Sequence, residues 1–347
     1  MSEHPSVPLL EVADVATGFE TLRGLVRAVD GVSFTLERGR TLGIVGESGS
    51  GKTVLSRSIM GLLPHHGVVR RGSIRFEGTE IGQASPKEMR KFWGDAMAMV
   101  FQDPMTSLNP VMKIGKQITE AIHTHLDVTR QFGNELALSL LESVRVPDPE
   151  RRMGEYPHQL SGGLRQRICI AVALACGPQL LLADEPTTAL DVTVQAQVLD
   201  VLAQQQRERF MAVILVTHDL GVVAGRADDV LVMYAGQVVE KAPTATLFRD
   251  MKMPYTEALL RSIPKLSEPS HTRLAAIPGR PPDLVAPPPG CRFAPRCPYA
   301  QDRCREEMPP LVAAEAPGHE YRCWFPVGSG SAPTAAPSPA APPTGGA

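Results

Sequence analysis

The stretch from Gly46 to Thr53 constrains this chain more than any other. It reads Gly-Glu-Ser-Gly-Ser-Gly-Lys-Thr, which fits the pattern G-x-x-x-x-G-K-T. The apolar residues 41–45 before it are typical of a buried strand, and residues 54–63 after it are typical of a helix. A glycine-rich loop between a strand and a helix predicts a phosphate-binding site. A plain turn with a surface lysine is the alternative, and the motifs described below argue against it.

The positions of this loop have separate chemical roles. Glycines let the backbone turn its N–H groups inward around a phosphate chain, and the helix start adds a partial positive charge. We expect Lys52 to reach the terminal phosphates and the Thr53 hydroxyl to coordinate Mg²⁺. The other residues of the loop that we expect to bind the nucleotide are Gly46, Ser48, Gly49, Ser50 and Gly51.

A second apolar run, residues 180–183, ends in Asp184 and Glu185. A continuous apolar strand of this kind is typical of a parallel sheet that is buried on both faces. Because phosphoryl transfer relies on positioned charge, carboxylates at a strand end beside the phosphate-binding loop are expected. We expect Asp184 to hold Mg²⁺ and Glu185 to polarise the attacking water. An ordinary acidic turn is the alternative.

The charge balance argues against one class of partner. With 35 Lys and Arg against 37 Asp and Glu the formal net charge is −2, so electrostatic binding to nucleic acid is not expected. Residues 1–15 lack the basic start and apolar core of a secretion signal. The most apolar run, residues 168–176, is too short to span a bilayer. We therefore expect a soluble protein in the cytoplasm.

The hydrophobic pattern predicts an α/β fold with several regions. Short apolar stretches separated by turns between residues 7 and 45 indicate antiparallel strands, and apolar residues at helical spacing over 112–145 indicate a helical insert. Strands and helices then alternate to about residue 265, which predicts a mixed or parallel core sheet. Of the 32 prolines, 17 lie in residues 278–347, and residues 327–347 form a predicted disordered tail.

Together these motifs resemble those of ABC-type ATPases, and they occur in that family's order. Residues 46–53 match the Walker A motif and residues 180–185 match Walker B. Residues 100–104 resemble the Q-loop, residues 160–167 the signature, residues 189–191 (Ala-Leu-Asp) the D-loop, and His218 the switch histidine. The resemblance implies a P-loop NTPase fold with an antiparallel β subdomain and a helical subdomain.

The resemblance also implies a mechanism, in which two such domains enclose two ATP molecules. Glu185, His218 and Gln102 would be the catalytic residues, and Gln102 would also bind the nucleotide. Thr53, Gln102 and Asp184 would coordinate Mg²⁺. Ser161 and Gly163, at a predicted helix N-terminus, would face the γ-phosphate bound by the partner. The family stacks adenine on an aromatic residue, for which the candidates here are Phe19 or a residue near Arg23.

Further stretches, residues 106–111, 254–260 and 289–298, resemble the peptide-importer branch of the family. This branch implies an ATP-binding domain over residues 7–265 and a C-terminal extension over 266–326. It also implies a place at the cytoplasmic face of the membrane.

The partners implied are two permease subunits, a second and different ATPase, and an extracytoplasmic peptide-binding protein. The helical insert, which the resemblance places at about 104–160, would dock the permease. Nickel importers share much of the ending, so nickel import is an alternative. A non-transport ABC ATPase is the alternative from another class, although the sequence contains neither a long coiled coil nor tandem cassettes.

Four of the six cysteines, Cys291, Cys297, Cys304 and Cys323, lie in the extension. In a reducing cytosol such a cluster indicates a metal before disulfides. The C-x2-C spacing of structural zinc sites is absent, and four widely spaced thiolates suit a [4Fe-4S] cluster, which the peptide-importer resemblance also implies. Zinc and free thiols remain alternatives, and His319 is an alternative ligand to Cys323. We expect the metal to stabilise a segment with little core of its own.

Overall fold

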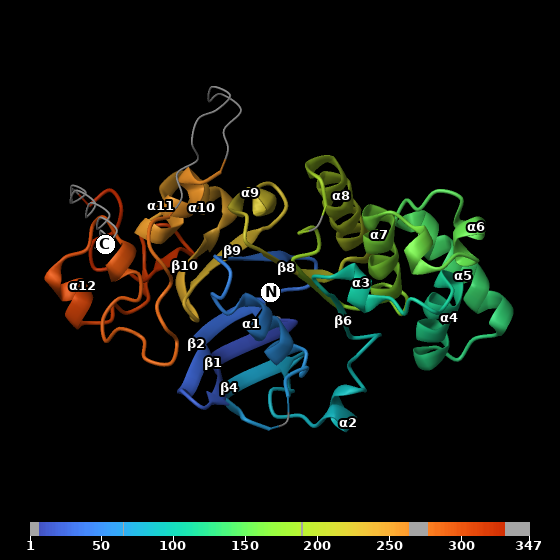
Figure 1. Cartoon of the computed structure of the whole chain (residues 1–347), viewed down its shortest axis with the longest axis horizontal. Helices are drawn as coiled ribbons and strands as arrows, with labels where there is room; N and C mark the ends of the chain where they lie inside the picture. Colours follow the sequence, from blue (N-terminus) through green and yellow to red (C-terminus); the bar gives the residue numbers. More distant parts are fainter. Residues whose placement is uncertain (1–6, 65, 189, 264–276, 330–347) are drawn as a thin grey trace, which may run out of the picture.

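The computed structural model describes residues 7–64, 66–188, 190–263 and 277–329 (Figure 1). Its central sheet has the strand order β11-β12-β10-β9-β3-β8-β7-β6. The parallel strands are β3 (Thr41–Val45), β6 (Met97–Val100), β7 (Leu180–Asp184), β8 (Ala212–Thr217) and β9 (Asp229–Tyr234). Strand β10 (Gln237–Pro243) runs antiparallel to β9, so the predicted mixed sheet is confirmed.

The central strands divide the interior into two cores. Successive side chains of a strand point to opposite faces, so Leu180 and Leu182 lie in one core while Leu181 and Ala183 lie in the other. The first core is closed by the antiparallel sheet, and the second by helices. This burial on both faces explains the unbroken apolar runs in the sequence.

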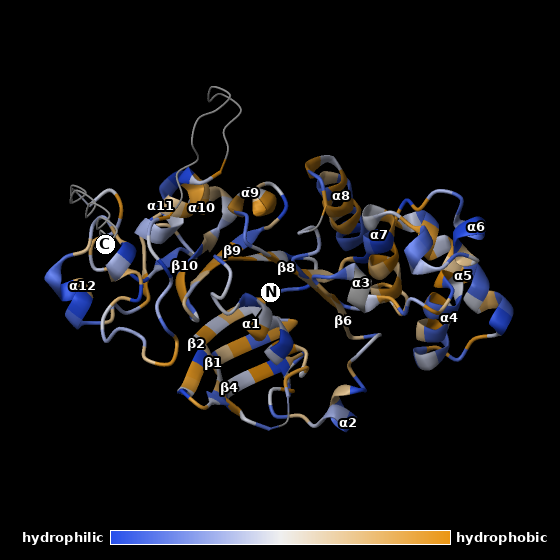
Figure 2. Cartoon of the chain, viewed as in Figure 1, coloured by the Kyte–Doolittle hydropathy of each residue, from blue (hydrophilic) through white to orange (hydrophobic). Residues whose placement is uncertain are grey.

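The antiparallel sheet that the N-terminal pattern predicts is present, with the order β2-β1-β4-β5. Its strands are β1 (Leu10–Thr21), β2 (Gly24–Leu36), β4 (Val68–Phe76) and β5 (Thr79–Glu80). Figure 2 shows apolar and polar residues in turn along β1, β2 and β4, as expected for a sheet with one buried face.

Helix α1 (Lys52–Ile59) follows the phosphate-binding loop and is shorter than the predicted helix to Leu63. The helix ends because Gly61 takes a φ of 65° and the Leu62 N–H donates to the Arg57 carbonyl oxygen, 2.9 Å away. A glycine in the left-handed conformation, followed by a residue whose N–H bonds to a carbonyl oxygen five residues earlier, is a common helix terminator. Only the short helix α2 (Pro86–Met89) separates β5 from β6.

The helical insert forms one end of the molecule in Figure 1. Its elements are α3 (Pro104–Ser107), α4 (Ile114–His125), α5 (Arg130–Ser143), α6 (Pro149–Met153) and the 3-10 turn Pro157–Gln159. Ile114, Ile118 and Ile122 are fully buried at helical spacing. Helices α7 (Gly162–Ala173) and α8 (Val192–Arg209) connect the insert to the central sheet.

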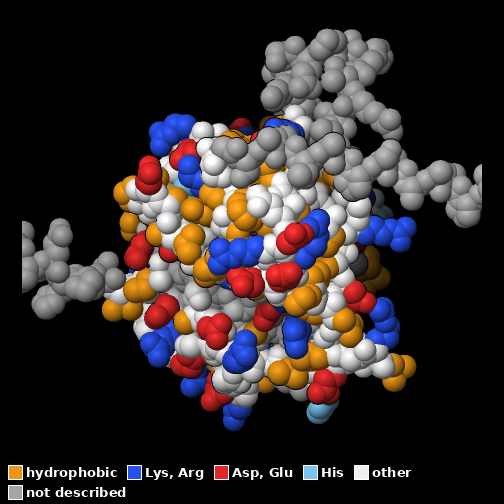
Figure 3. Space-filling view, turned by 90° about the vertical axis from the view of Figure 1, so that its left-hand side faces the viewer, with side chains coloured by type: hydrophobic (Ala, Val, Ile, Leu, Met, Phe, Trp, Pro, Cys, Tyr) orange, Lys and Arg blue, Asp and Glu red, His pale blue; other side chains and the backbone are white. Residues whose placement is uncertain are grey.

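The opposite end contains α9 (Leu220–Val223), α10 (Thr244–Asp250), α11 (Pro254–Arg261) and the C-terminal extension. The extension contains α12 (Asp302–Glu306) and strands β11 (Val312–Ala313) and β12 (Glu320–Tyr321). Strand β12 pairs with β10, so the extension prolongs the central sheet, which the sequence analysis did not predict. Figure 3 shows positive and negative side chains interspersed at this end.

The buried pair of His319 and Glu240 fixes this junction. His319 Nε2 lies 2.8 Å from Glu240 Oε1, and both side chains are 0% exposed.

Ala189 of the D-loop lies outside the described residues, and so does the part of the predicted tail that follows Ser329. Within the described ranges, no helix combines the length and apolarity that crossing a bilayer requires.

Candidate nucleotide-binding site

The phosphate-binding loop needs its glycines for close packing of backbone on backbone. Gly51 has a φ of 102°, and a Cβ added there would lie 2.2 Å from the Ala28 carbonyl oxygen. A Cβ at Gly46 would lie 2.2 Å from the Met233 carbonyl oxygen. Only glycine therefore fits both positions, and the loop keeps an open cradle ahead of the N-terminus of α1.

Lys52, the first residue of α1, places its ammonium group inside this loop. Its Nζ donates to the carbonyl oxygens of Gly46 at 2.8 Å and Glu47 at 3.0 Å, and its side chain is only 4% exposed. Burial lowers the pKa of Lys52, and the Glu185 carboxylate, with Oε1 at 3.9 Å from Nζ, opposes that shift. A buried ammonium group in a ring of backbone groups suits an anionic phosphate.

Thr53 and Asp184 meet beside the loop. The Thr53 hydroxyl donates to Asp184 Oδ1 at 3.1 Å. Asp184 ends β7 and is 2% exposed; burial raises its pKa, and the Thr53 hydrogen bond opposes the shift. Hydroxyl and carboxylate oxygens are the ligands that Mg²⁺ prefers. Because a cation would favour the ionised carboxylate, this pair fits the predicted Mg²⁺ site.

Three predicted catalytic side chains converge from the ends of neighbouring strands. Gln102 follows β6, Glu185 follows β7 and His218 follows β8. Gln102 Nε2 donates to Glu185 Oε2 at 2.9 Å, and His218 Nδ1 lies 3.4 Å from the same oxygen. Because the carboxyl ends of parallel strands meet at one edge of a sheet, residues far apart in sequence reach one carboxylate.

The sequence analysis missed one contact of Glu185. The Thr188 hydroxyl donates to Glu185 Oε2 at 2.8 Å. Glu185 has a φ of 47°, and this tight turn after β7 brings Thr188 back over the carboxylate. The Pro186 that follows Glu185 was the sequence signal for such a turn.

The structure does not bring Ser161 and Gly163 to this loop. Ser161 precedes α7, and Gly163 packs so closely that an added Cβ would lie 2.4 Å from Val194 Cγ1 on α8. Figure 1 shows α7 beside the helical insert and away from α1. The exposed Ser161 is therefore accessible to a second molecule and not to the loop of its own chain.

The adenine candidates lie on the antiparallel sheet. Phe19 on β1 pairs with Val26 and Val68 on the neighbouring strands and is half-buried. Arg23, in the turn after β1, forms an ion pair with Asp283 of the extension. Phe19 as the adenine contact stays a prediction.

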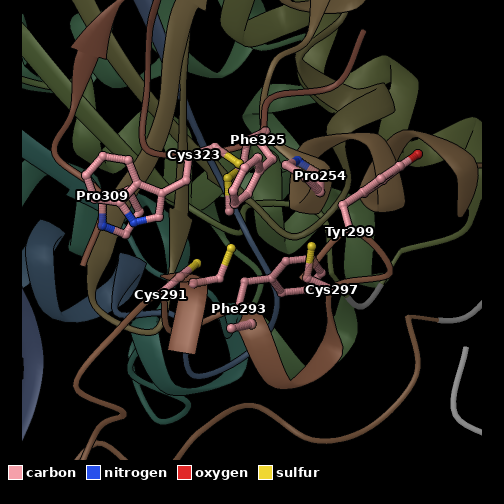
Figure 4. Close-up of a pocket in the computed structure, with 12 residues that line it drawn as sticks. Pro254, Cys291, Phe293, Cys297, Tyr299, Pro309, Cys323 and Phe325 are labelled. Carbon is pink, nitrogen blue, oxygen red and sulfur yellow. The ribbon is translucent and has the colours of Figure 1, made fainter. Parts of the chain in front are cut away.

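The four cysteines of the extension line one pocket. All are free thiols, and they line the pocket together with Phe293 and Phe325 (Figure 4). Burial raises the pKa of Cys297 and of Cys323 to about 12. Among the described residues, no group of three or more His, Cys, Asp and Glu side chains is placed to hold a metal.

Protein contacts hold the extension against the ATPase body. His319, the alternative metal ligand, is bonded to Glu240. Edge-to-face ring contacts join Phe293 to Tyr234 and Tyr255, both at centroid distances of 5.3 Å, so the extension shares the main core. The extension therefore has little core of its own, as expected, and its apolar residues complete the core of the ATPase body.

Comparisons with known proteins agree with this geometry. A family model for ABC transporters matches residues 29–188, and a model for the C-terminal region of oligopeptide/dipeptide transporters matches residues 239–304. Among solved structures, the dimeric MJ0796 cassette of a bacterial ABC transporter has a TM-score of 0.61 at 25% identity, covering 68% of this chain and 98% of that chain.

Curated relatives match over most of their length. The oligopeptide transport ATP-binding protein OppD of Bacillus subtilis is 50% identical over 91% of this chain and 88% of its own. The dipeptide transport ATP-binding protein DppD of Escherichia coli is 47% identical over 94% of this chain and 99% of its own. The chain therefore belongs to the family of ATP-binding proteins of peptide ABC transporters.

Proposed function

We propose that this chain hydrolyses ATP to drive the import of dipeptides or oligopeptides across the cytoplasmic membrane. The convergence of Gln102, Glu185 and His218 beside the Lys52 loop supports the ATPase activity. The named relatives support the peptide substrate, since both OppD of Bacillus subtilis and DppD of Escherichia coli are peptide transport proteins. They also disfavour nickel as the substrate.

Each side chain of the site has a role in this proposal. The loop, including Ser48, Gly49 and Ser50, binds the phosphate chain, and Lys52 neutralises its charge. Thr53, Gln102 and Asp184 would hold Mg²⁺, which would neutralise charge on the phosphate oxygens. Glu185 accepts the proton of the attacking water, and Gln102 and Thr188 orient its carboxylate through the hydrogen bonds at 2.9 and 2.8 Å. His218 contacts the same carboxylate and completes the site.

The position of the signature motif supports a dimer. Ser161 and Gly163 lie away from the loop of their own chain, so a second ATPase has to supply these groups to each ATP. We propose that the second ATPase is a different chain, and that the pair binds two permease subunits served by a peptide-binding protein outside the cell. In this assembly the chain lies peripherally on the cytoplasmic face of the membrane.

A groove beside the helical insert suits the permease. It has a volume of about 240 Å³ and is lined by Leu62, Trp93, Phe101, Ala121 and His125, among others. Phe101, directly before Gln102, is 39% exposed there. A permease helix seated in this groove would contact the residue next to the catalytic glutamine.

We propose the domain limits 7–265 for the ATPase and 266–326 for the extension.

We also propose that Cys291, Cys297, Cys304 and Cys323 bind a [4Fe-4S] cluster. Support comes from their convergence on one apolar pocket and from the absence of disulfides among them. Iron and labile sulfide, measured after anaerobic purification and in a Cys297→Ser variant, test this assignment. Iron near four atoms per chain supports it; zinc instead of iron, or neither, would overturn it.

Reconstitution tests the transport function. The chain, its partner ATPase and the two permeases are placed in lipid vesicles, and ATP hydrolysis is followed as peptide-loaded binding protein is added. We expect stimulation by peptide and none with binding protein alone. Hydrolysis that ignores peptide would contradict the proposed coupling.

A further inference from the structure

Arg296 of the extension reaches the phosphate-binding loop. Its NH1 donates to Glu47 Oε2 at 2.6 Å and its NH2 to Glu47 Oε1 at 2.9 Å, which is the bidentate geometry that guanidinium and carboxylate groups favour. Glu47 lies directly after Gly46, inside the loop. The Arg296 side chain is 3% exposed and the Glu47 side chain 27% exposed. Neither Arg296 nor Glu47 is one of the predicted catalytic residues.

All the donors of Arg296 have acceptors. Besides Glu47, its Nε donates to the Pro278 carbonyl oxygen at 2.8 Å, its NH2 to that of Ile277 at 3.2 Å, and its NH1 to the Tyr234 hydroxyl at 3.2 Å. These contacts match the five N–H donors of a guanidinium group. The group is thus fixed in orientation, and it transmits the position of the extension to Glu47.

Glu47 is held at each of its polar groups. Its carboxylate binds Arg296, its N–H donates to the Tyr255 hydroxyl at 2.8 Å, and its carbonyl oxygen accepts from Lys52 Nζ at 3.0 Å. The extension, α11 and the phosphate-binding lysine therefore meet at one residue. Arg296 also neutralises a carboxylate that would repel a phosphate chain bound in this loop.

A second arginine of the same short segment contacts a turn that is hydrogen-bonded to the loop. Arg292 donates to the Ala235 carbonyl oxygen and forms an ion pair with Asp30. Gly236, the next residue in that turn, donates its N–H to the Ser50 carbonyl oxygen at 2.9 Å. The segment is anchored in turn, because the Cys291 N–H donates to the Cys304 carbonyl oxygen at 2.7 Å.

We propose that residues 291–297 form a brace that holds the phosphate-binding loop in its binding conformation, with Arg296 as the positioning residue that sets ATP affinity. The C-terminal extension is thereby part of the nucleotide site. This inference rests on ATP binding at the loop, and on neither the peptide substrate nor the iron-sulfur cluster.

Nucleotide affinity of the purified full-length chain tests the brace. A fluorescent ATP analogue is titrated against wild type, Arg296→Met, Arg296→Lys and the control Arg305→Met, which removes an exposed ion pair of the same extension. We expect Arg296→Met to raise Kd about tenfold and Arg296→Lys, which keeps the charge but loses the fork, to raise it about threefold. The control should stay at the wild-type value.

Two further readouts separate positioning from folding. In the double variant Glu47→Gln/Arg296→Met the repelling charge of Glu47 is gone, so Kd should be at least about threefold lower than in Arg296→Met. In the reconstituted transporter, Arg296→Lys should raise KM for ATP and leave kcat unchanged. A purely structural role would lower Tm with no change in Kd. If Arg296→Met does not fold, Arg296→Lys decides: a wild-type Kd in that variant would overturn the proposal.

Discussion

Single side chains in this site have several partners at once, and Glu185 is the clearest case. Its Oε2 atom accepts hydrogen bonds from Gln102 and Thr188 and lies 3.4 Å from His218 Nδ1. Its other oxygen lies 3.9 Å from Lys52 Nζ. A carboxylate held this way is oriented before substrate arrives, and such preorganisation is a main source of catalysis.

Replacing Glu185 tests its role as the base. Glu185→Gln keeps the shape of the side chain but removes the proton acceptor, so we expect turnover of the assembled ATPase to fall by about 10²- to 10⁴-fold. ATP binding should persist, because Lys52 and the loop are unchanged. Phosphate release measures the first effect and nucleotide titration the second. Glu306→Gln, an exposed change on α12, is the control; near-normal turnover in Glu185→Gln would remove the residue from this role.

The sequence predicts residues of this site where local pattern and chemistry coincide. Lys52, Asp184 and Glu185 follow from a glycine-rich loop and from an acidic strand end. Thr188 and Arg296 do not, because their importance depends on which atoms they contact. Arg296 lies 249 residues after Glu47, and its neighbours Cys291 and Cys297 drew attention to thiol chemistry instead.

At the scale of elements, the phosphate-binding loop depends on where the backbone has room. Gly51 and Gly49 both have positive φ values, 102° and 78°. An added Cβ at Gly51 would lie 2.2 Å from the Ala28 carbonyl oxygen, whereas at Gly49 nothing lies within 4 Å. The motif therefore requires glycine at these two positions for different physical reasons: Gly51 has no room for a Cβ, whereas Gly49 is constrained only by its positive φ.

These glycines form a matched pair for mutation. Gly51→Ala forces the loop away from β2, so we expect loss of measurable ATP binding and a lower Tm. Gly49→Ala adds only backbone strain, of about 1–2 kcal/mol, so the chain should fold and bind ATP more weakly. Calorimetric titration and thermal unfolding measure both. Equal effects of the two changes would show that packing against Ala28 does not determine the loop.

Strands were easier to predict than the ends of helices or the path of the extension. Residues 41–45 and 180–183 are continuous apolar runs, and they form β3 and most of β7. The end of α1 depends on a single glycine, Gly61, inside an apolar sequence. Strands β11 and β12 have two residues each, which is too short for any periodic signal.

At the scale of the whole molecule, the extension and the ATPase body share one interior. Phe293 is 1% exposed and packs on Tyr234 and Tyr255, which come from β9 and α11. The sequence predicted a segment with little core of its own, and its aromatic residue Phe293 is buried on a surface that another part of the protein supplies. The extension is therefore expected to unfold together with the body.

Truncating Phe293 tests that shared core. Phe293→Ala should lower the free energy of unfolding by about 3–5 kcal/mol, because it removes a buried ring and leaves a cavity. Urea denaturation of the purified chain, followed by tyrosine and tryptophan fluorescence, measures the change. Phe132→Ala on α5, where the side chain is 52% exposed, is the control and should have little effect. A small effect of Phe293→Ala would mean that the extension is only loosely docked.

The most direct test of the whole account is solute uptake by cells that carry either the wild-type chain or Glu185→Gln as their only copy. Labelled dipeptides and oligopeptides are supplied, with nickel measured in parallel. We predict that Glu185→Gln abolishes peptide uptake and leaves nickel uptake intact. Unchanged peptide uptake with loss of nickel uptake would assign the chain to metal import, and no change in either would contradict a role in transport.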